Sequence, residues 1–216
     1  MSTSLPRKVP QLAVYVTTGP GETLRSTTAL VIKECGAECV GIDDDPNEID
    51  KARRLFPGCS YACENAENLT FEAGYFDTII VRDSLHHLYQ DADFEKVKTE
   101  ILRVSHRGTV LIFFDPNVNF MLRTFRFLSA HKDAECNFGT ARRIMSELGF
   151  REIHVSFNTL FSLPLSGGYV GINFVPGSKI LWNSILTAER FFEKLADTVG
   201  LSRWLGWRYL IVGVRE

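Results

Sequence analysis

The stretch V-G-I-D-D-D-P-N-E-I-D-K-A-R, from Val40 to Arg53, changes from a strand-like pattern to a helix-like pattern. Its first residues are small or apolar and continue a run that begins at Glu38, which is typical of a buried strand. Its last part can present one apolar stripe on a helix, and Pro46 falls in the first turn, where proline is tolerated. The stretch therefore predicts a strand that ends at an acid and leads directly into a helix.

The same alternation extends through about the first 150 residues. Strands are predicted at 12–16, 38–42, 60–63, 78–82, 109–114 and 152–157, and helices at 22–35, 46–55, 93–104 and 140–148. Several of the strands are almost continuously apolar, as expected for parallel strands that are covered on both faces. This order predicts an α/β fold, a doubly wound and mostly parallel sheet with helices on both faces.

The last part of the chain is richer in large apolar residues. A helix is predicted at 178–198 and a closing strand at 207–214. No linker separates these segments from the rest, so one domain over 1–216 is expected, with a core at 12–157, a covering segment at 158–206 and a last strand at 207–216. The aromatic residues of this part favour core packing or a subunit contact, with a substrate pocket as the alternative. They are Trp182, Phe191, Phe192, Trp204 and Trp207.

The composition is that of an ordinary globular protein. Of 216 residues, 45% are hydrophobic and 23% are charged, enough to bury one core. The net charge of -2 gives no electrostatic reason to expect nucleic acid as the main partner. No run resembles a secretory signal or is long enough to span a bilayer, so a cytoplasmic protein without a membrane partner is expected.

The cysteines predict reduced thiols rather than disulfides. There are five of them, an odd number, and they are scattered through apparent core elements. Two C-x-x-x-C pairs suggest zinc as an alternative, but structural zinc sites use tighter spacing. No metal is therefore expected.

Asp43 stands where the second strand ends. Ligands of open parallel sheets bind beyond the carboxyl ends of the strands, and an acid at that place can accept hydrogen bonds from a ribose diol. About twenty residues separate Gly21 from Asp43, as in nucleotide-binding β-α-β units. Ribose binding is favoured for Asp43. Asp44, the next candidate, and Asp45 are better explained as caps of the following helix.

Three segments carry the most specific pattern. They are G-I-D-D-D-P-N-E-I-D-K-A-R at 41–53, E-N-A-E-N-L-T-F at 64–71 and F-D-T-I-I-V-R-D-S-L-H-H-L at 76–88. In this order and spacing they resemble the class I methyltransferases that use S-adenosylmethionine. The likeness covers about 12–157, and 209–214 is similar to the antiparallel seventh strand of that family. The resemblance implies a seven-stranded sheet, methyl transfer, and S-adenosylmethionine bound by the core.

The resemblance also implies roles for individual residues. Asp43 would hold the ribose, and Asn65 and Ala66 would line the adenine edge. Arg82 and Asp83, at the end of the fourth strand, would face the amino-acid part of the cofactor. Asn65 stands where the family commonly has Asp, and its amide oxygen can still accept a hydrogen bond from the adenine amino group.

The first loop departs from the family's pattern. The stretch T-T-G-P-G-E-T at 17–23 stands where the family has G-x-G-x-G, and Tyr15 replaces the acid that ends the first strand. Thr17, Gly19 and Gly21 remain the expected cofactor contacts, although a side chain in place of a glycine keeps the backbone from approaching a ligand. Weaker binding is therefore expected. The alternative is a methyltransferase-like protein that serves as a binding or assembly partner without catalysis.

Two adjacent histidines follow the fourth strand. His86 and His87 are candidate catalytic bases, because imidazole accepts a proton near neutral pH. Capping or packing is the alternative, since positioning alone can accelerate methyl transfer from a sulfonium. A small-molecule acceptor is predicted, and a homodimer is the assembly considered. A nicotinamide-dependent enzyme ranks lower, because it gives no role to 65–67 or 85–88.

Overall fold

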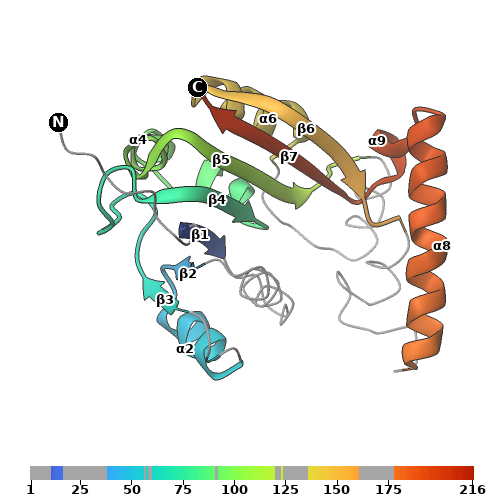
Figure 1. The fold of residues 1–216 in the computed structure, drawn as a ribbon, viewed down its shortest axis with the longest axis horizontal. Helices are drawn as coiled ribbons and strands as arrows, with labels where there is room; N and C mark the ends of the chain where they lie inside the picture. Colours follow the sequence, from blue (N-terminus) through green and yellow to red (C-terminus); the bar gives the residue numbers. More distant parts are fainter. Residues whose placement is uncertain are drawn as a thin grey trace.

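The computed structural model describes residues 11–16, 38–55, 57, 60–90, 92–119, 123, 136–160 and 178–216, and for 11–16 it describes the backbone alone. The strands are β1 (Gln11–Val16), β2 (Glu38–Asp43), β3 (Ser60–Cys63), β4 (Phe76–Arg82), β5 (Ser105–Pro116), β6 (Phe150–Asn158) and β7 (Arg208–Arg215). The helices are α2 (Pro46–Leu55), α3 (Leu85–Gln90), α4 (Phe94–Val104), α6 (Phe138–Glu147), α8 (Lys179–Thr198) and α9 (Ser202–Leu205). Figure 1 shows their arrangement.

Most predicted elements are present, with shifted ends. The bounds of α2 and β3 agree with the prediction, whereas β5 begins at Ser105 instead of Thr109. The sequence did not predict the short helices α3 and α9. The helix predicted at 22–35 lies outside the described residues.

The strands pair in the order β3-β2-β1-β4-β5-β7-β6. The pairs from β3 to β5 are parallel, and β7 is antiparallel to both β5 and β6. The chain moves outward from β1 to β2 and β3, then returns to place β4 on the other side of β1. This reversal makes the β1–β4 neighbourhood the switch point, where ligands of open α/β sheets bind. The predicted α/β class is confirmed.

The strand registers bring the candidate residues to one edge of the sheet. Val16 pairs with Arg82, and Arg82 pairs in turn with Phe114 of β5. On the other side of β1, Asp43 pairs with Cys63 at the end of β3. The carboxyl ends of five strands therefore meet along a single edge, called here the carboxyl edge.

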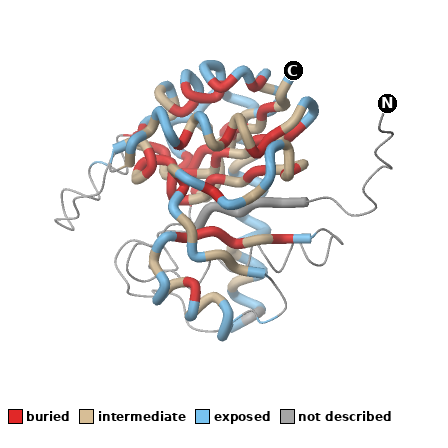
Figure 2. Tube along the Cα trace, turned by 90° about the vertical axis from the view of Figure 1, so that its left-hand side faces the viewer, coloured by how far each residue is buried: buried red, intermediate tan, exposed pale blue. Residues whose placement is uncertain are grey.

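The core lies along the central strands and the helices packed on them. Figure 2 shows buried residues concentrated there, with exposed residues toward α2. In α4 the buried residues Val97, Ile101 and Val104 recur at helical spacing. They join a cluster that includes Ile79 of β4 and Phe113 of β5. Burying such a side chain contributes roughly 1.5–3 kcal/mol, so this cluster holds the strands that carry the carboxyl edge.

The C-terminal helices are fixed at the carboxyl edge. In Figure 1, α8 stands beyond the edge to which β4 and β5 point. Asn117 Nδ2 donates to the carbonyl oxygens of Arg203 and Gly206, at 2.8 and 2.9 Å. Asn119 Nδ2 donates to Gly206 at 2.8 Å and to Trp204 at 3.0 Å. Two side-chain amides after β5 thus hold the turn that leads from α9 to β7.

The late aromatic residues do not share one environment. Trp207 is buried, as core packing predicts, but Phe191 and Trp204 are 66% and 64% exposed. Core packing is therefore the wrong interpretation for Phe191 and Trp204. Apolar residues at helical spacing on α8 do not reveal by themselves whether they face the core or the solvent. None of the helices within the described ranges is long and apolar enough to cross a membrane.

Candidate functional site

Asp43 is buried at the end of β2, and its two carboxylate oxygens differ. Oδ1 accepts a hydrogen bond from the backbone N–H of Asp45 at 2.8 Å. Oδ2 is also buried, yet it has no hydrogen-bond partner in the described part of the chain. Burial raises the pKa of Asp43 to about 6, opposed by the Asp45 N–H. Because a buried acceptor without a partner costs free energy, Oδ2 is a suitable acceptor for hydroxyl donors of a ligand.

The two neighbouring aspartates have other surroundings. Asp45 Oδ1 accepts from the backbone N–H of Asn47 at 2.8 Å, in the first turn of α2. The cap interpretation is thus confirmed for Asp45. Asp44 is exposed beside Asp43, so its carboxylate lies in water rather than in the buried environment of its neighbour.

Gly41 makes room for the ring of Tyr61 next to this acid. A Cβ atom at Gly41 would lie 2.7 Å from Tyr61 Cδ1 and 2.9 Å from Cε1. Glycine therefore allows β3 and its aromatic residue to lie close against β2. The backbone continues this contact at the strand ends, where Glu64 N–H donates to the carbonyl oxygen of Asp43 at 3.0 Å.

Asn65 lies in a turn after β3 that its own side chain helps to hold. Its Oδ1 accepts from the backbone N–H of Glu67 at 2.8 Å, and its carbonyl oxygen accepts from Asn68 N–H at 3.0 Å. Asn65 is exposed, whereas Ala66 is buried. An amide oxygen has two lone pairs, so the bond to Glu67 leaves acceptor capacity on Asn65. The contact of Asn65 and Ala66 with adenine stays a prediction.

Asp83 is held by a buried ion pair with Arg208, at the start of β7. Its backbone is in the left-handed region, with a φ of 52°, and its N–H donates to Phe114 at 2.9 Å. Arg82 Nε lies 3.5 Å from Asp83 Oδ2. The guanidinium carbons of Arg208 and Arg82 lie 5.1 and 5.6 Å from the centroid of the Phe114 ring. The charge of Asp83 is therefore already neutralised within the protein.

The sequence alone did not identify Arg208 as a partner of this site. The residue is 125 positions from Asp83. One signal was present, because an arginine at the start of a strand that is otherwise apolar needs a buried partner. The proposed contact of Arg82 and Asp83 with a cofactor stays a prediction.

Asp115 fixes the beginning of α3. It is completely buried, and its Oδ1 accepts from Ser84 N–H at 3.0 Å. Its Oδ2 accepts from His86 N–H at 3.2 Å and lies 3.1 Å from His86 Nδ1. Burial raises the pKa of Asp115, while the contact with His86 opposes that rise. The carboxylate thus joins the end of β5 to the turn between β4 and α3.

The two candidate bases lie side by side in different degrees of burial. His86 is buried, whereas His87 is half-buried, and their ring centroids are 4.4 Å apart. The contacts of His86 with Asp115 support the capping and packing alternative for that residue. The catalytic role of either residue stays a prediction.

The remaining candidates from the first loop, Thr17, Gly19 and Gly21, lie outside the described residues. In the described ranges, no group of three histidine, cysteine or acidic side chains is placed to hold a metal ion. Cys39 and Cys136 are buried thiols, and Cys63 is an exposed one. In the described part of the site, the Asp43 carboxylate therefore has one oxygen available to a ligand. The carboxylates of Asp83 and Asp115 are instead engaged by partners within the protein.

Comparison with known proteins identifies the domain. A family model described as "Methyltransferase domain" matches residues 16–113. Comparison by sequence with curated proteins finds no match.

Solved structures share the fold at low sequence identity. An S-adenosylmethionine-dependent methyltransferase from Archaeoglobus fulgidus is 16% identical, with a TM-score of 0.63 over 96% of this chain and 87% of its own. One from Methanosarcina mazei is 13% identical, with a TM-score of 0.62 over 97% and 93%. A geranyl diphosphate C-methyltransferase from Streptomyces coelicolor A3(2) is 14% identical, with a TM-score of 0.62 over 96% and 74%. Residues 16–113 therefore match the methyltransferase-domain family, and the resemblance of this chain to the class I, S-adenosylmethionine-dependent methyltransferases is confirmed.

Proposed function

We propose that this protein transfers the methyl group of S-adenosylmethionine to a small-molecule acceptor. The observation that carries the proposal is the buried, open Oδ2 of Asp43 at the carboxyl edge. The family match supports it, since residues 16–113 include β2 and Asp43. The Streptomyces coelicolor protein with this fold is crystallised with S-adenosyl-L-homocysteine and geranyl diphosphate.

Asp43 fits the ribose of the cofactor chemically. Hydroxyl groups of the ribose would donate to Oδ2, which the described residues leave without a donor. A hydrogen bond to an ionised acceptor contributes about 1.5–3 kcal/mol, enough to offset the cost of its burial. Asn65, Ala66 and the loop at 17–21 would complete the site, as the resemblance implies.

When bound, S-adenosylmethionine supplies an electrophilic methyl group on a positively charged sulfur. The residues of this chain would orient the reactants and exclude water. We assign positioning to Asp115 and His86, because their mutual contacts hold the turn after β4. His87 remains the candidate base for removing a proton from the acceptor.

The acceptor would lie between the carboxyl edge and the C-terminal part of the chain. The described portion of that part, α8 and α9, stands beyond the ends of β4 and β5 in Figure 1. This arrangement supports the division into a cofactor-binding core at 12–157, a covering segment at 158–206 and a last strand. The net charge of -2 favours a small molecule over a nucleic acid.

Calorimetric titration with S-adenosylmethionine, and with its demethylated product, tests the proposal. We expect micromolar affinity for the wild type and a loss of about 100-fold for Asp43→Ala, which removes two charge-assisted hydrogen bonds. Asp44→Ala is the matched control, because Asp44 is the exposed neighbour, and it should change affinity less than about threefold. Folded wild-type protein that shows neither heat nor a thermal shift at millimolar ligand would refute the proposal.

A further inference from the structure

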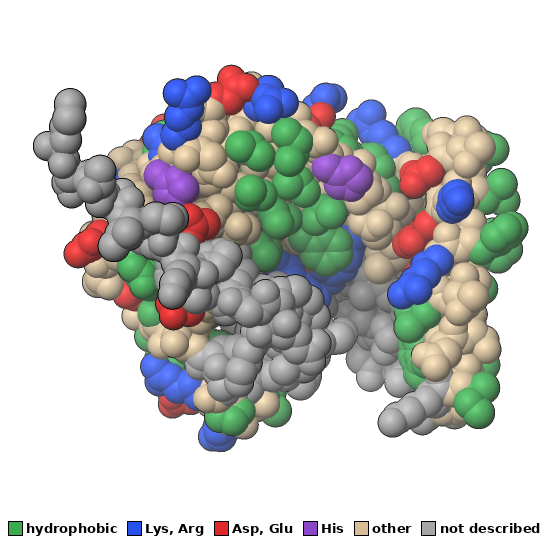
Figure 3. Space-filling model, viewed as in Figure 1, with side chains coloured by type: hydrophobic (Ala, Val, Ile, Leu, Met, Phe, Trp, Pro, Cys, Tyr) green, Lys and Arg blue, Asp and Glu red, His purple; other side chains and the backbone are tan. Residues whose placement is uncertain are grey.

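The C-terminal helix pair presents an apolar face to solvent. Its exposed side chains define the apolar stripe, which consists of Ile180, Phe191, Phe192, Leu195 and Val199 of α8 and Trp204 of α9. Ile180 is 81% exposed. In Figure 3, α8 lies at the right, with apolar side chains along its outer edge and charged side chains toward the rest of the molecule. An exposed stripe of this extent marks a surface that binds another apolar surface.

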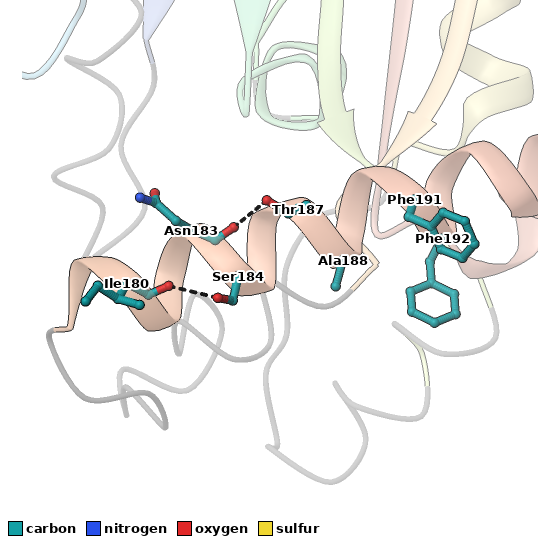
Figure 4. A pocket seen from close by; sticks show the side chains of 7 residues that line it. All are labelled: Ile180, Asn183, Ser184, Thr187, Ala188, Phe191 and Phe192. Atoms are coloured by element: carbon teal, nitrogen blue, oxygen red, sulfur yellow. Dashed lines mark hydrogen bonds between the residues drawn. The ribbon is translucent and has the colours of Figure 1, made fainter.

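The polar residues within the stripe add little polarity to it. Ser184 Oγ donates to the carbonyl oxygen of Ile180 at 3.0 Å, and Thr187 Oγ1 donates to that of Asn183 at 2.7 Å. Figure 4 shows these bonds along α8, with Ala188 and Phe192 pointing to the same side of the helix. These residues line a shallow groove of about 830 Å³. Both hydroxyl donors are thus satisfied by the helix itself, and the surface that remains is mainly carbon.

The charges beside the stripe are mostly positive. Arg190 and Lys194 are exposed on α8, and the only exposed acid there is Asp197. Glu189 is buried, and Glu193 accepts a hydrogen bond from Thr159 N–H at 2.7 Å on the side toward the sheet. The exposed charge of α8 therefore differs in sign from the net charge of -2 of the whole chain.

The geometry points to a membrane surface with anionic lipids as the partner of the apolar stripe. We propose that α8 and α9 dock on such a surface, with the stripe among the acyl chains and Arg190 and Lys194 at the headgroups. Aromatic and aliphatic residues on one face with cations beside them are typical of helices that lie in the interface. The sequence excluded a membrane because no run can span one, but a helix lying in the plane has no need to.

The charges favour lipid over a second copy of this chain. In an antiparallel pairing of two α8 helices, the two-fold symmetry would set Arg190 and Lys194 of both copies along the same rim. Each copy then brings two cations and one exposed acid, Asp197, to the rim, so the rim stays net positive and its two halves repel, whereas anionic headgroups attract it. This inference goes beyond the proposed methyl transfer and does not depend on it.

Co-sedimentation with vesicles tests the docking. Vesicles of phosphatidylcholine alone are compared with vesicles containing about one third phosphatidylglycerol, so that the anionic charge is the variable. We expect at least tenfold stronger partitioning of the wild type to the anionic vesicles, together with a blue shift of Trp204 fluorescence. Phe191→Glu should weaken that partitioning at least tenfold. The double variant Arg190→Glu and Lys194→Glu should weaken it by about tenfold or more.

Ile153→Glu is the matched control. It places the same charge on another exposed apolar residue, on β6, and should leave partitioning unchanged. Urea denaturation shows whether Phe191→Glu is folded. Absence of vesicle binding by the wild type would overturn the proposal, as would equal binding by Phe191→Glu. A wild-type dimer that Phe191→Glu dissociates, without vesicle binding, would assign the stripe to a second copy instead.

Discussion

Buried carboxylates at two places on the carboxyl edge differ in whether the protein itself supplies their partners. At the end of β2, Asp43 is buried, and its Oδ2 has no hydrogen-bond partner among the described residues. At the ends of β4 and β5, Asp83 is paired with Arg208, and Asp115 accepts from two backbone N–H groups and contacts His86. One place is open to a ligand, and the other is closed by the fold.

This difference distinguishes a carboxylate that is available to bind a ligand from carboxylates that stabilise the fold. A buried carboxylate oxygen without a donor costs free energy, so the open Oδ2 of Asp43 is best explained by a ligand that supplies one. A buried acid that is paired with a cation, or that accepts hydrogen bonds from the backbone, instead stabilises the structure around it. Burial and charge alone do not distinguish these cases. Only the partners show that Asp43 is available, while Asp83 and Asp115 hold the turn between β4 and α3.

Removing the ion pair between Asp83 and Arg208 should have the largest effect on stability. Arg208→Leu leaves the buried Asp83 without its nearest cation, with Arg82 at 3.5 Å remaining, and should lower the free energy of unfolding by about 3 kcal/mol. Arg142→Leu is the control, because Arg142 makes two bonds to Glu152, at 2.7 and 2.8 Å, but on the surface. It should cost less than about 1 kcal/mol in urea denaturation. Equal losses in the two variants would contradict the assignment of the Arg208 pair as a structural core contact.

A smaller loss is expected from Asp115→Asn. The amide nitrogen that replaces one oxygen cannot accept from Ser84 N–H or from His86 N–H, so one donor is left facing another. We expect a cost of about 2–3 kcal/mol in urea denaturation. His87→Ala should cost less than about 1 kcal/mol, because the Asp115 carboxylate contacts the ring of His86 instead. A larger cost for His87→Ala would show that His87 also belongs to the clamp.

The position of Asp43 at the end of β2 and the capping by Asp45 were predictable from the sequence, but the pairing of Asp83 was not. Asp43 and Asp45 act through contacts within a few residues of the chain, at 2.8 Å to Asp45 N–H and Asn47 N–H. Local pattern is sufficient for such contacts. The pairing of Asp83 with Arg208 joins residues 125 positions apart, and its existence depends on β7 lying beside β5. A single sequence does not encode that adjacency in any local signal.

The prediction that the aromatic residues of α8 pack in the core was wrong for a related reason. Helical spacing of Phe191, Leu195 and their neighbours identifies a stripe, and the usual partner of a stripe is the core. Here the buried side of the helix instead carries Glu189 and Ala196. The direction of a stripe depends on where the helix docks, and the docking contacts come from Asn117, Asn119 and Glu193.

The pH dependence of cofactor binding tests whether the ionised Asp43 carboxylate takes part in it. Burial raises the pKa of Asp43 to about 6, and under the proposed function ribose hydroxyls would donate to its ionised form. Affinity for S-adenosylmethionine should therefore rise with pH through about 6 and be roughly tenfold weaker at pH 5 than at pH 8. Titration in two buffers of different ionisation enthalpy should show proton release at pH 6. Equal affinity at both pH values would contradict a role for the Asp43 carboxylate.

The smallest expected effect has the opposite sign to that of Arg208→Leu. The pKa of Asp43 is about 6 in the folded protein and 3.8 as its ordinary value, so the folded state holds the proton more tightly. Its contribution to stability is present below about pH 4 and is lost as the pH rises through 6. Asp43→Asn removes this penalty and keeps an acceptor for Asp45 N–H, although the new amide N–H₂ is itself buried. At pH 8 the variant should therefore be more stable than the wild type, by about 1 kcal/mol without ligand.

The same variant should bind S-adenosylmethionine more weakly, because a neutral amide accepts weaker hydrogen bonds than a carboxylate. Urea denaturation between pH 4 and 8 measures the first effect, and calorimetry measures the second. Asp44→Asn is the control, since its exposed carboxylate lies in water, and it should change neither quantity. A gain in stability with a loss in binding is the expected signature of a carboxylate kept for a ligand. Loss of both would place Asp43 with Asp83 and Asp115 among the residues that build the fold.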